Sequence, residues 1–417
     1  MHLSFQLSKV YKNSKIKITG SKSETNRLLL LQALYSNITL ENTSKSDDSD
    51  VMFEALKNCQ LLTDNYQRIN VHHAGTAMRF LTAYFAQNEG LEVVLTGSSR
   101  MKERPIKILA EALKQLGAEI TYEEKEGFPP IRIKGKKITK NKISIKADVS
   151  SQYISALLLI APKLENGLEL TLKGEITSIP YIKMTLALLN EIGVETVFKN
   201  NVIKVNPKPI IDNTQLVIES DWSSASYFYS IVALSNIGTQ ITLSGYKENS
   251  LQGDSVLVDI YKDFGVETVF QKNSILLRKV EIHNSQFIIH NLKNCPDIAQ
   301  TIAVTCFGLG LACHLTGLHT LKIKETDRLE ALKTELSKLG AEISVTNDSL
   351  ALEQSSEIKE NITIKTYQDH RMAMAFAPLA LRVPLVIEEA EVVSKSYPTF
   401  WEDLKTIGFE VEDNPIV

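Results

Sequence analysis

The stretch LSKLGAEISV (residues 336–345) holds a phrase that returns along the chain: a helical ending rich in leucine, then a glycine, a hydrophobic residue and a glutamate. Related phrases are KQLGAEI, LNEIGVETV, YKDFGVETVF and LKTIGFEVE, and the repeated glycines are Gly117, Gly193, Gly265, Gly340 and Gly408. Because these glycines recur every 68 to 76 residues, the pattern predicts one repeated structural unit. Each glycine is expected at the left-handed position that ends a helix before a strand.

A second kind of helix recurs at the same spacing and is apolar on nearly every face. Its six copies begin in GSKSETNR, AGTAMRF, SSQYISA, SSASYFY, PDIAQTIA and DHRMAMA. A helix that is apolar all round is buried, so each unit is expected to wrap one such helix with strands and an exposed helix. Six units predict an α/β fold with two similar domains of three units each. The boundary is expected near residue 220, and the first strand (residues 3–19) could belong to either half.

Composition limits the classes of partner. The 417 residues carry a formal net charge of −3, which leaves no global attraction for nucleic acid, so any anion site must be local. No secretory start or apolar stretch of about 20 residues is found, so a soluble, unexported protein without membrane contact is expected. The cysteines form no CxxC pair or His cluster, which fits a reducing compartment without structural zinc. They are Cys59, Cys295, Cys306 and Cys313, and the last two are expected to be buried thiols.

The polar starts of the apolar helices are the predicted sites of chemistry, because a helix N-terminus presents free N–H groups and partial positive charge. In GSKSETNR (residues 20–27), the serines offer hydroxyls, while Lys22 and Arg27 suit phosphate or carboxylate. An ordinary helix cap with a solvated lysine explains this motif equally well. The acidic run at residues 41–50 reads as a solvated turn and helix cap.

Two further motifs in the N-terminal half carry cations. In HHAGTAMRF (residues 72–80), Arg79 lies in an apolar helix and needs an anionic partner, for which a structural carboxylate is the alternative to a ligand. The adjacent histidines point apart and have no third ligand nearby, so no metal site is predicted. In SSRMKERPI (residues 98–106), Arg100 is a candidate ligand beside a helix start at Pro105, and a solvated loop is the alternative.

The remaining motifs combine hydroxyls with acids and bases. The segments DVSSQYISA (148–156) and TSIPYIKMT (177–185) suit a polyhydroxylated, phosphorylated substrate, although capping alone explains Ser150 and Ser151. In the C-terminal half, PDIAQ, KETDRLEAL, YQDHRMAM and KSYPTF are placed at predicted helix starts and combine acid/base groups with an anion clamp. Surface ion pairing is the alternative for KETDRLE, where Glu325 and Leu329 are expected one turn apart on an amphipathic helix.

Taken in order along the whole chain, GSKS..NR, AGTAMR, RM.ERPI, SSQ, KETDRL and DHRMAM resemble the EPSP synthase (3-phosphoshikimate 1-carboxyvinyltransferase) family of enolpyruvyl transferases. The resemblance implies two domains of three βαβαββ-type units each, an inside-out α/β barrel fold. One domain is residues 20–219, which would bind shikimate 3-phosphate. The other is residues 1–19 with 220–417, which would supply acid/base and phosphoenolpyruvate residues.

The resemblance also implies a reaction, the transfer of the enolpyruvyl group of phosphoenolpyruvate to the 5-hydroxyl of 3-phosphoshikimate. This step belongs to chorismate and aromatic amino acid biosynthesis and is the target of glyphosate. The implied catalytic residues are Lys22, Asp297, Glu325 and His370. The implied shikimate 3-phosphate ligands are Lys22, Ser23, Arg27, Ser150, Ser151, Gln152, Ser178, Tyr181, Asp297 and Lys324. The implied phosphoenolpyruvate ligands are Lys22, Gly75, Arg100, Gln152, Arg328, Arg371 and Lys395.

No cofactor and no metal are expected, and the enzyme is expected to be a cytoplasmic monomer. Two alternatives remain: the sister UDP-N-acetylglucosamine enolpyruvyl transferase, and a non-catalytic anion-binding protein on the same fold. The sister enzyme carries Lys-Asn where this chain has Lys22-Ser23 and usually has a loop cysteine missing here. Four positions depart from the family pattern and bear on substrate affinity and glyphosate sensitivity: Thr19, His73, Phe80 and Thr320.

Overall fold

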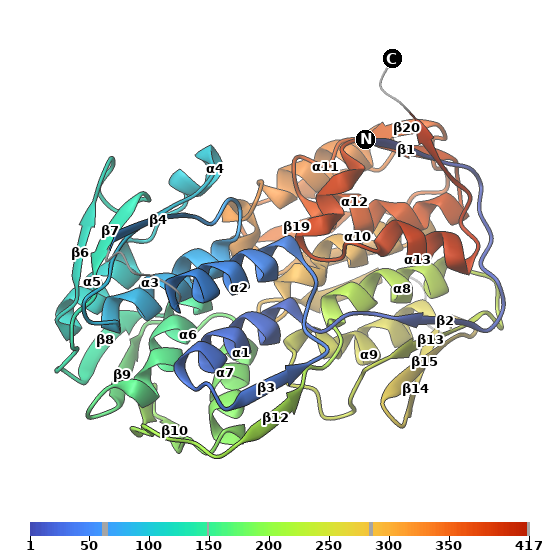
Figure 1. Ribbon diagram of the computed structural model, residues 1–417. Coiled ribbons are helices and arrows are strands. Elements are labelled where there is room, and N and C mark those ends of the chain that lie inside the picture. Colours follow the sequence, from blue (N-terminus) through green and yellow to red (C-terminus); the bar gives the residue numbers. More distant parts are fainter. Residues whose placement is uncertain (61–65, 148–149, 283–286, 415–417) are drawn as a thin grey trace. The chain divides into compact units, whose positions relative to one another are not determined.

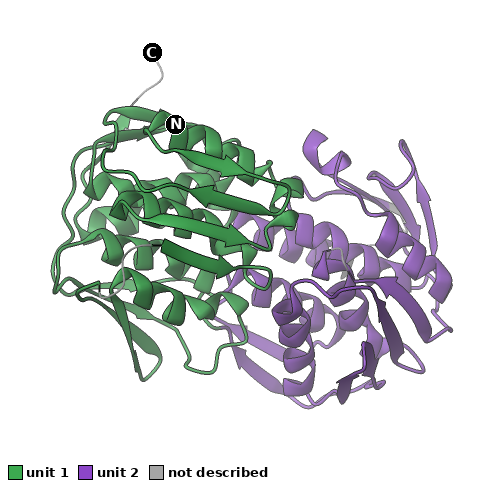
Figure 2. Cartoon of the chain, turned by 180° about the vertical axis from the view of Figure 1, so that it is seen from behind, with its two compact units in different colours: residues 1–20, 219–417 green, residues 21–218 purple. Residues whose placement is uncertain are grey.

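The chain forms two compact units. The computed structural model describes residues 1–60, 66–147, 150–282 and 287–414. Unit 1 is formed by Met1–Gly20 and Glu219–Val417, and unit 2 by Ser21–Ile218 (Figure 2). The chain therefore starts in one unit, builds the other, and returns.

Five of the six sheets in the described residues share one strand order. In four of them, the first two strands of the sheet in chain order are parallel, and the last strand lies antiparallel between the second and the third; in the fifth, β20-β21-β1-β22, the N-terminal strand β1 takes this inner place. The clearest example is β16 (Phe287–Asn291), β17 (Ala312–Thr316), β19 (Ser349–Leu352) and β18 (Ile343–Val345). In this sheet, a buried helix connects the first two strands and an outer helix leads to the third. This order confirms the predicted βαβαββ-type units.

Unit 2 departs from the prediction in its third sheet. Two of its sheets have four strands, in the orders β4-β5-β7-β6 and β10-β11-β9-β8, but β12 and β3 form a parallel pair without a hairpin among the described residues. Helix α2 (Asp47–Gln60) is instead followed by β4 of a neighbouring sheet. The strands are β3 (Ile38–Glu41), β4 (Tyr66–Asn70), β5 (Glu92–Thr96), β6 (Glu119–Tyr122), β7 (Ile131–Lys134), β8 (Lys142–Lys146), β9 (Leu168–Lys173), β10 (Thr196–Lys199), β11 (Val202–Val205) and β12 (Thr214–Val217).

Unit 1 takes in the N-terminal strands, whose place the sequence left open. Strand β1 (His2–Phe5) lies between β21 and β22 and is antiparallel to both, while β2 (Ser14–Lys17) is parallel to β13. The start of the chain thus completes sheets built from its far end. The other strands are β13 (Gln240–Ser244), β14 (Val266–Gln271), β15 (Ser274–Lys279), β20 (Ile362–Ile364), β21 (Leu385–Ile387) and β22 (Val411–Asn414).

All six apolar helices are buried, as the sequence predicts. In unit 2, α3 packs against both α1 and α6; in unit 1, α10 packs against both α8 and α12 (Figure 1). Each fully buried Leu, Ile or Phe side chain on them contributes about 1.5–3 kcal/mol, so these helices form the core of each unit. The helices are α1 (Lys22–Leu34), α3 (Gly75–Gln87), α6 (Ser151–Ile160), α8 (Trp222–Leu234), α10 (Ala299–Leu309) and α12 (His370–Phe376).

The five repeated glycines have positive φ angles, between 69° and 113°, and end their helical segments as predicted. Four follow the α-helices α5 (Lys107–Leu116), α7 (Ile179–Glu191), α11 (Arg328–Lys338) and α13 (Phe400–Ile407). Gly265 differs, because it follows a 3₁₀ segment, Tyr261–Phe264, which comes after the single-turn helix α9 (Leu257–Ile260).

Within the described residues, no helix has the length and apolar character that crossing a bilayer requires. Cys306 and Cys313 are buried free thiols, as predicted, and Cys295 is also free and buried. The side chain of Cys59 lies outside the described part of the structure.

Candidate active site

A buried guanidinium organises the predicted residues of unit 2. Arg27, one turn into α1, is only 2% exposed. It donates from Nε to Thr185 Oγ1 (2.8 Å), from Nη1 to Ser23 O (2.7 Å), and from Nη2 to Ser155 Oγ (3.1 Å) and Tyr181 O (3.5 Å). All four acceptors are neutral oxygens. Burial lowers the pKa of Arg27 to about 10, which leaves it cationic at neutral pH.

Lys22 opens α1 and corrects one prediction. Its Nζ lies 3.3 Å from Asp48 Oδ2. Asp48 belongs to the acidic run that was predicted to be a solvated turn, but its side chain is only 14% exposed, and Ser46 and Ser49 in the same run are buried. The helix-cap part of the prediction is confirmed, because Ser46 Oγ accepts from the Ser49 N–H at the start of α2. The solvated part is wrong for these residues, which pack into the unit, where the hydroxyls of Ser46 and Ser49 bond each other at 3.1 Å.

The starts of α3 and α6 are joined by a hydrogen bond that local sequence could not predict. Gln152 Nε2 donates to Thr76 Oγ1 at 3.0 Å. Ser150 Oγ accepts a hydrogen bond from the backbone N–H of Gln152 at 3.3 Å and therefore caps α6. Ser151, the first residue of α6, is buried. The sequence shows that Thr76 is a hydroxyl residue at a helix start, but only the packing of α3 against α6 identifies it as the partner of Gln152.

Gly75 opens α3 in close contact with a guanidinium. A Cβ added there would lie 2.6 Å from Arg104 Nη1, so the neighbour could not stay in place beside any larger residue. Arg79, one turn on, donates to the carbonyl oxygens of Gly75 and Pro105, each at 3.1 Å. Pro105 precedes α5 by two residues and does not start the helix, contrary to prediction.

Two predicted ligands in unit 2 lie in distinctive settings. Arg100, in the short helix α4 (Ser99–Lys102), is well exposed and pairs with Glu103 at 2.9 Å. Ser178, just before α7, has a φ of 53° and makes no capping hydrogen bond with its side chain. A left-handed serine is strained by about 1–3 kcal/mol, and such strain clusters at functional positions.

A second buried arginine organises unit 1, in opposite surroundings. Arg328, also 2% exposed, donates from Nε to Asp369 Oδ2 (2.6 Å), from Nη1 to Asp297 Oδ1 (2.9 Å) and from Nη2 to Glu325 Oε2 (2.8 Å). Burial alone would lower the pKa of Arg328, but the three carboxylates raise it above its ordinary value. The alternative of a surface ion pair is therefore wrong.

Glu325 lies outside the helix in which it was expected. Asp327 accepts from the backbone N–H groups of Leu329 and Glu330 and so caps α11, which begins at Arg328. Glu325 precedes that cap, so Glu325 and Leu329 do not share a helical turn. The cap frees the Glu325 carboxylate to bend back onto Arg328.

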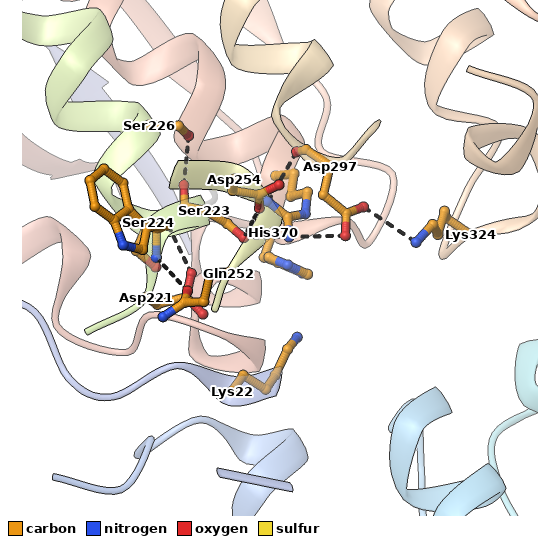
Figure 3. Close-up of polar contacts among 12 residues, drawn as sticks. Lys22, Asp221, Ser223, Ser224, Ser226, Gln252, Asp254, Asp297, Lys324 and His370 are labelled. Carbon is orange, nitrogen blue, oxygen red and sulfur yellow. Dashed lines mark hydrogen bonds and ion pairs between the residues drawn. The ribbon is translucent and has the colours of Figure 1, made fainter. Parts of the chain in front are cut away.

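Asp297 is surrounded by cations (Figure 3). Lys324 Nζ lies 3.3 Å from its Oδ1 and Arg371 Nη2 lies 3.6 Å from its Oδ2, while Arg371 Nη1 also donates to its carbonyl at 3.1 Å. Burial would raise the pKa of Asp297, but Lys324, Arg371 and Arg328 hold it well below the ordinary value. Asp297 is therefore ionised at neutral pH.

His370 and Lys395 lie beside this network. His370 opens α12, is buried, and has Nδ1 3.9 Å from Asp369 Oδ1. Lys395 ends the 3₁₀ segment Ala390–Lys395, and not a helix start as expected, and donates from Nζ to Gln368 O at 2.7 Å. Both contacts involve residues at the start of α12.

Sequence reasoning missed two members of this group. Arg371 Nη2 donates to Ser223 Oγ at 3.3 Å, and Ser223 Oγ donates to Asp254 Oδ2 at 2.7 Å (Figure 3). Ser223 opens an apolar helix like the other motif residues and could have been singled out on that ground. Asp254 has no such signal, because nothing near it in sequence indicates burial beside Arg371.

Many of the predicted residues of each unit therefore lie at or just before helix starts, whereas Arg100 lies in the short helix α4 and Lys395 ends a 3₁₀ segment. Unit 2 presents a buried cation, hydroxyls and an amide, which suit a polyhydroxylated anion. Unit 1 presents carboxylates among cations, which suit proton transfer beside an anion. Across the described ranges, no three His, Cys, Asp or Glu side chains are arranged to hold a metal ion.

Comparison with known proteins identifies relatives of the whole chain. The model of the EPSP synthase (3-phosphoshikimate 1-carboxyvinyltransferase) family matches residues 58–404. A 3-phosphoshikimate 1-carboxyvinyltransferase of Bacteroides fragilis is 45% identical over 406 residues, which cover 95% of this chain and 96% of that protein. One from Haemophilus influenzae is 36% identical over 422 residues, covering 94% and 96%.

Solved structures show the same fold. An EPSP synthase from Acinetobacter baumannii has a TM-score of 0.78 at 20% identity, covering 99% of this chain and 100% of that one. The enolpyruvyl transferase NikO from Streptomyces tendae has a TM-score of 0.76 at 12% identity, covering 99% and 98%. The fold is the two-domain enolpyruvyl transferase fold, and the chain belongs to the EPSP synthase family.

Proposed function

We propose that the protein is a 3-phosphoshikimate 1-carboxyvinyltransferase, which joins phosphoenolpyruvate to the 5-hydroxyl of shikimate 3-phosphate and releases inorganic phosphate. The observation that carries the proposal is the Arg328 network, in which two candidate proton-transfer groups, Asp297 and Glu325, bind one buried guanidinium. The 45% identity to a relative of that name over nearly the whole chain supports the same reaction.

Shikimate 3-phosphate would be bound mainly by unit 2, and we propose residues 20–219 as its binding domain. Arg27 supplies a positive charge that no acceptor in its hydrogen-bond shell neutralises, which favours an anionic ligand. Lys22, Ser23, Ser150, Ser151, Gln152, Ser178 and Tyr181 would complete the ligand set. Asp297 and Lys324 would address the substrate hydroxyls.

Phosphoenolpyruvate carries a phosphate and a carboxylate, so its binding needs several cations. In unit 1 we propose Arg328, Arg371 and Lys395, in the domain formed by residues 1–19 and 220–417. In unit 2 we propose Lys22, Gly75, Arg100 and Gln152. A larger residue at 75 would have to displace the end of the Arg104 side chain, which lies against Gly75.

The chemistry is addition followed by elimination. Glu325 would protonate the methylene carbon of phosphoenolpyruvate, and Asp297 would take the proton of the 5-hydroxyl as that oxygen attacks C2. Glu325, deprotonated by the first step, would then take a proton back from the former methylene carbon as the bond between C2 and the phosphate oxygen breaks, which releases inorganic phosphate. Because Arg328 favours the ionised form of Glu325, we propose that Glu325 gains its proton as anionic substrate engages Arg328. Lys22 would supply auxiliary charge and His370 would lie beside the reacting groups.

Phosphate release on mixing the protein with phosphoenolpyruvate and each acceptor tests this function. Release only with shikimate 3-phosphate, and a 10²- to 10⁴-fold lower turnover in Glu325→Gln, are expected. Near-normal turnover of that variant would remove Glu325 as the acid. Release only with UDP-N-acetylglucosamine would favour the sister reaction, which neither the family match nor the named relatives favour. No release with either acceptor would favour a binding protein.

The proposal includes a cytoplasmic monomer. Buried free thiols at Cys295, Cys306 and Cys313 fit a reducing compartment, and both residue groups come from one chain. A solution mass corresponding to two chains during turnover would contradict the monomer.

A further inference from the structure

Asp254 is a buried carboxyl that the proposed reaction leaves without a function. It lies in the 3₁₀ segment Gly253–Val256 and is 4% exposed. Its Oδ2 accepts from Ser223 Oγ at 2.7 Å. Among the described residues, no group donates a hydrogen bond to Oδ1. Burying a half-satisfied carboxylate is costly, so its presence calls for an explanation.

The hydroxyl of Ser223 connects Asp254 to the network of unit 1. Its single proton is donated to Asp254, which leaves the oxygen lone pairs to accept from Arg371 Nη2 at 3.3 Å. Arg371 in turn donates to Asp297 O at 3.1 Å and lies 3.6 Å from Asp297 Oδ2. Asp254, Ser223, Arg371 and Asp297 thus form a chain of contacts across three buried-helix starts (Figure 3).

The direction of these bonds depends on the charge of Asp254. Burial raises the pKa of Asp254 to about 6, with Asp297 and Asp221 adding to the rise while Arg371 and the Ser223 hydrogen bond oppose it. Cys295 is also close enough that Asp254 raises the pKa of its thiol. At neutral pH Asp254 is ionised and can only accept, so Ser223 must donate to it and present lone pairs to Arg371.

We propose that Asp254 is a positioning residue that, through the Ser223 hydroxyl, holds the Arg371 guanidinium against Asp297 in the orientation that binds phosphoenolpyruvate. The inference rests on the proposed function, since that function makes Arg371 a ligand and Asp297 a base. Asp254 itself touches Ser223 and is not proposed to contact substrate.

The test is a double-mutant cycle on Asp254→Ala and Ser223→Ala, with KM for phosphoenolpyruvate and kcat measured at saturating shikimate 3-phosphate. Each single variant is expected to raise KM for phosphoenolpyruvate about tenfold. The double variant is expected to be no worse than either single variant, because both break the same link. Asp254→Asn keeps an acceptor for Ser223 and is expected to stay within about threefold of the wild type.

The matched control is Asp259→Asn, which removes a carboxylate from the adjacent helix α9. Asp259 is 74% exposed and pairs with Lys262 at the surface, so its kinetics should be those of the wild type. Three outcomes would each overturn the inference. In the first, the losses in the two single variants add up in the double variant; in the second, Asp254→Asn is as impaired as Asp254→Ala. In the third, both single variants keep a KM for phosphoenolpyruvate within twofold of the wild type. A wild type that releases no phosphate would instead contradict the proposed function, so the two failures are distinguishable.

Discussion

Two of the buried arginines, Arg27 in unit 2 and Arg328 in unit 1, have the same 2% exposure and opposite surroundings. Arg27 bonds hydroxyl and carbonyl oxygens, while Arg328 bonds three carboxylates. Burial therefore lowers the pKa of Arg27 to about 10, whereas Asp369, Glu325 and Asp297 outweigh burial and raise that of Arg328. A buried arginine that bonds no carboxylate offers its whole charge to a ligand; one that bonds several carboxylates also orients those acids beside the ligand.

Arg328→Met should be the most damaging substitution to stability. It leaves Asp369, Asp297 and Glu325 without their shared counter-charge, and breaking a buried pair costs about 3–5 kcal/mol. Urea unfolding at pH 7 would measure the loss. A stability equal to that of the wild type would show that the carboxylates do not need this guanidinium, and the comparison between the two arginines would fail.

Asp254→Asn should stabilise the protein. The pKa of Asp254 is raised from 3.8 to about 6, so the folded state binds its proton more tightly than the unfolded state. The resulting cost of ionisation is absent below about pH 4, grows between pH 4 and 6, and is fully present above. The variant should therefore gain about 1–3 kcal/mol at pH 8 and almost nothing at pH 4.

Thermal melts of Asp254→Asn and the wild type at pH 4, 6 and 8 would measure this gain. A variant less stable than the wild type at pH 8 would contradict it. Together with near wild-type kinetics of Asp254→Asn, a gain in stability would show that positioning needs a hydrogen-bond acceptor at residue 254, and that the charge of Asp254 is a cost to the fold.

Arg27→Met should weaken the binding of shikimate 3-phosphate while leaving the stability of the fold nearly unchanged. Thr185 and Ser155 still bond each other at 2.9 Å without the guanidinium, so unfolding free energy should change by no more than about 1 kcal/mol. Affinity for shikimate 3-phosphate should fall at least tenfold, or about 1.4 kcal/mol, because the proposed ligand set loses the buried cation of Arg27. Calorimetric titration would measure it, and unchanged affinity would show that the Arg27 charge is not offered to the ligand.

Asp259→Asn should have the smallest effect. Its pair with Lys262 is exposed, and such pairs contribute about 0–1 kcal/mol. Urea unfolding should place this variant within about 0.5 kcal/mol of the wild type. A larger loss would mean that removal of any carboxylate near Asp254 disturbs unit 1, and the Asp254 results would lose their specificity.

Much of the fold could be predicted from periodicity. The glycines after α5 and α13 and the apolar faces of α3 and α10 report local conformation and burial, which depend on nearby residues. The lack of a hairpin beside β3 and β12 in the described residues and the 3₁₀ segment before Gly265 were not predictable, because the same sequence phrase is compatible with either outcome and strand pairing with other segments decides between them.

Local sequence by itself determined the repeat, the buried helices and the polar residues at their starts, because capping, helix period and burial act over a few residues. Only the tertiary structure decided that Arg328 is a buried centre for three acids, that Asp48 pairs with Lys22, and that Asp254 reaches Arg371 through Ser223. Apart from Arg328 and Glu325, which are three positions apart, these contacts join residues from 26 positions apart, as for Lys22 and Asp48, to 148, as for Ser223 and Arg371. Their charges and hydrogen bonds depend on which helix starts are packed together, and the local sequence pattern does not specify this packing.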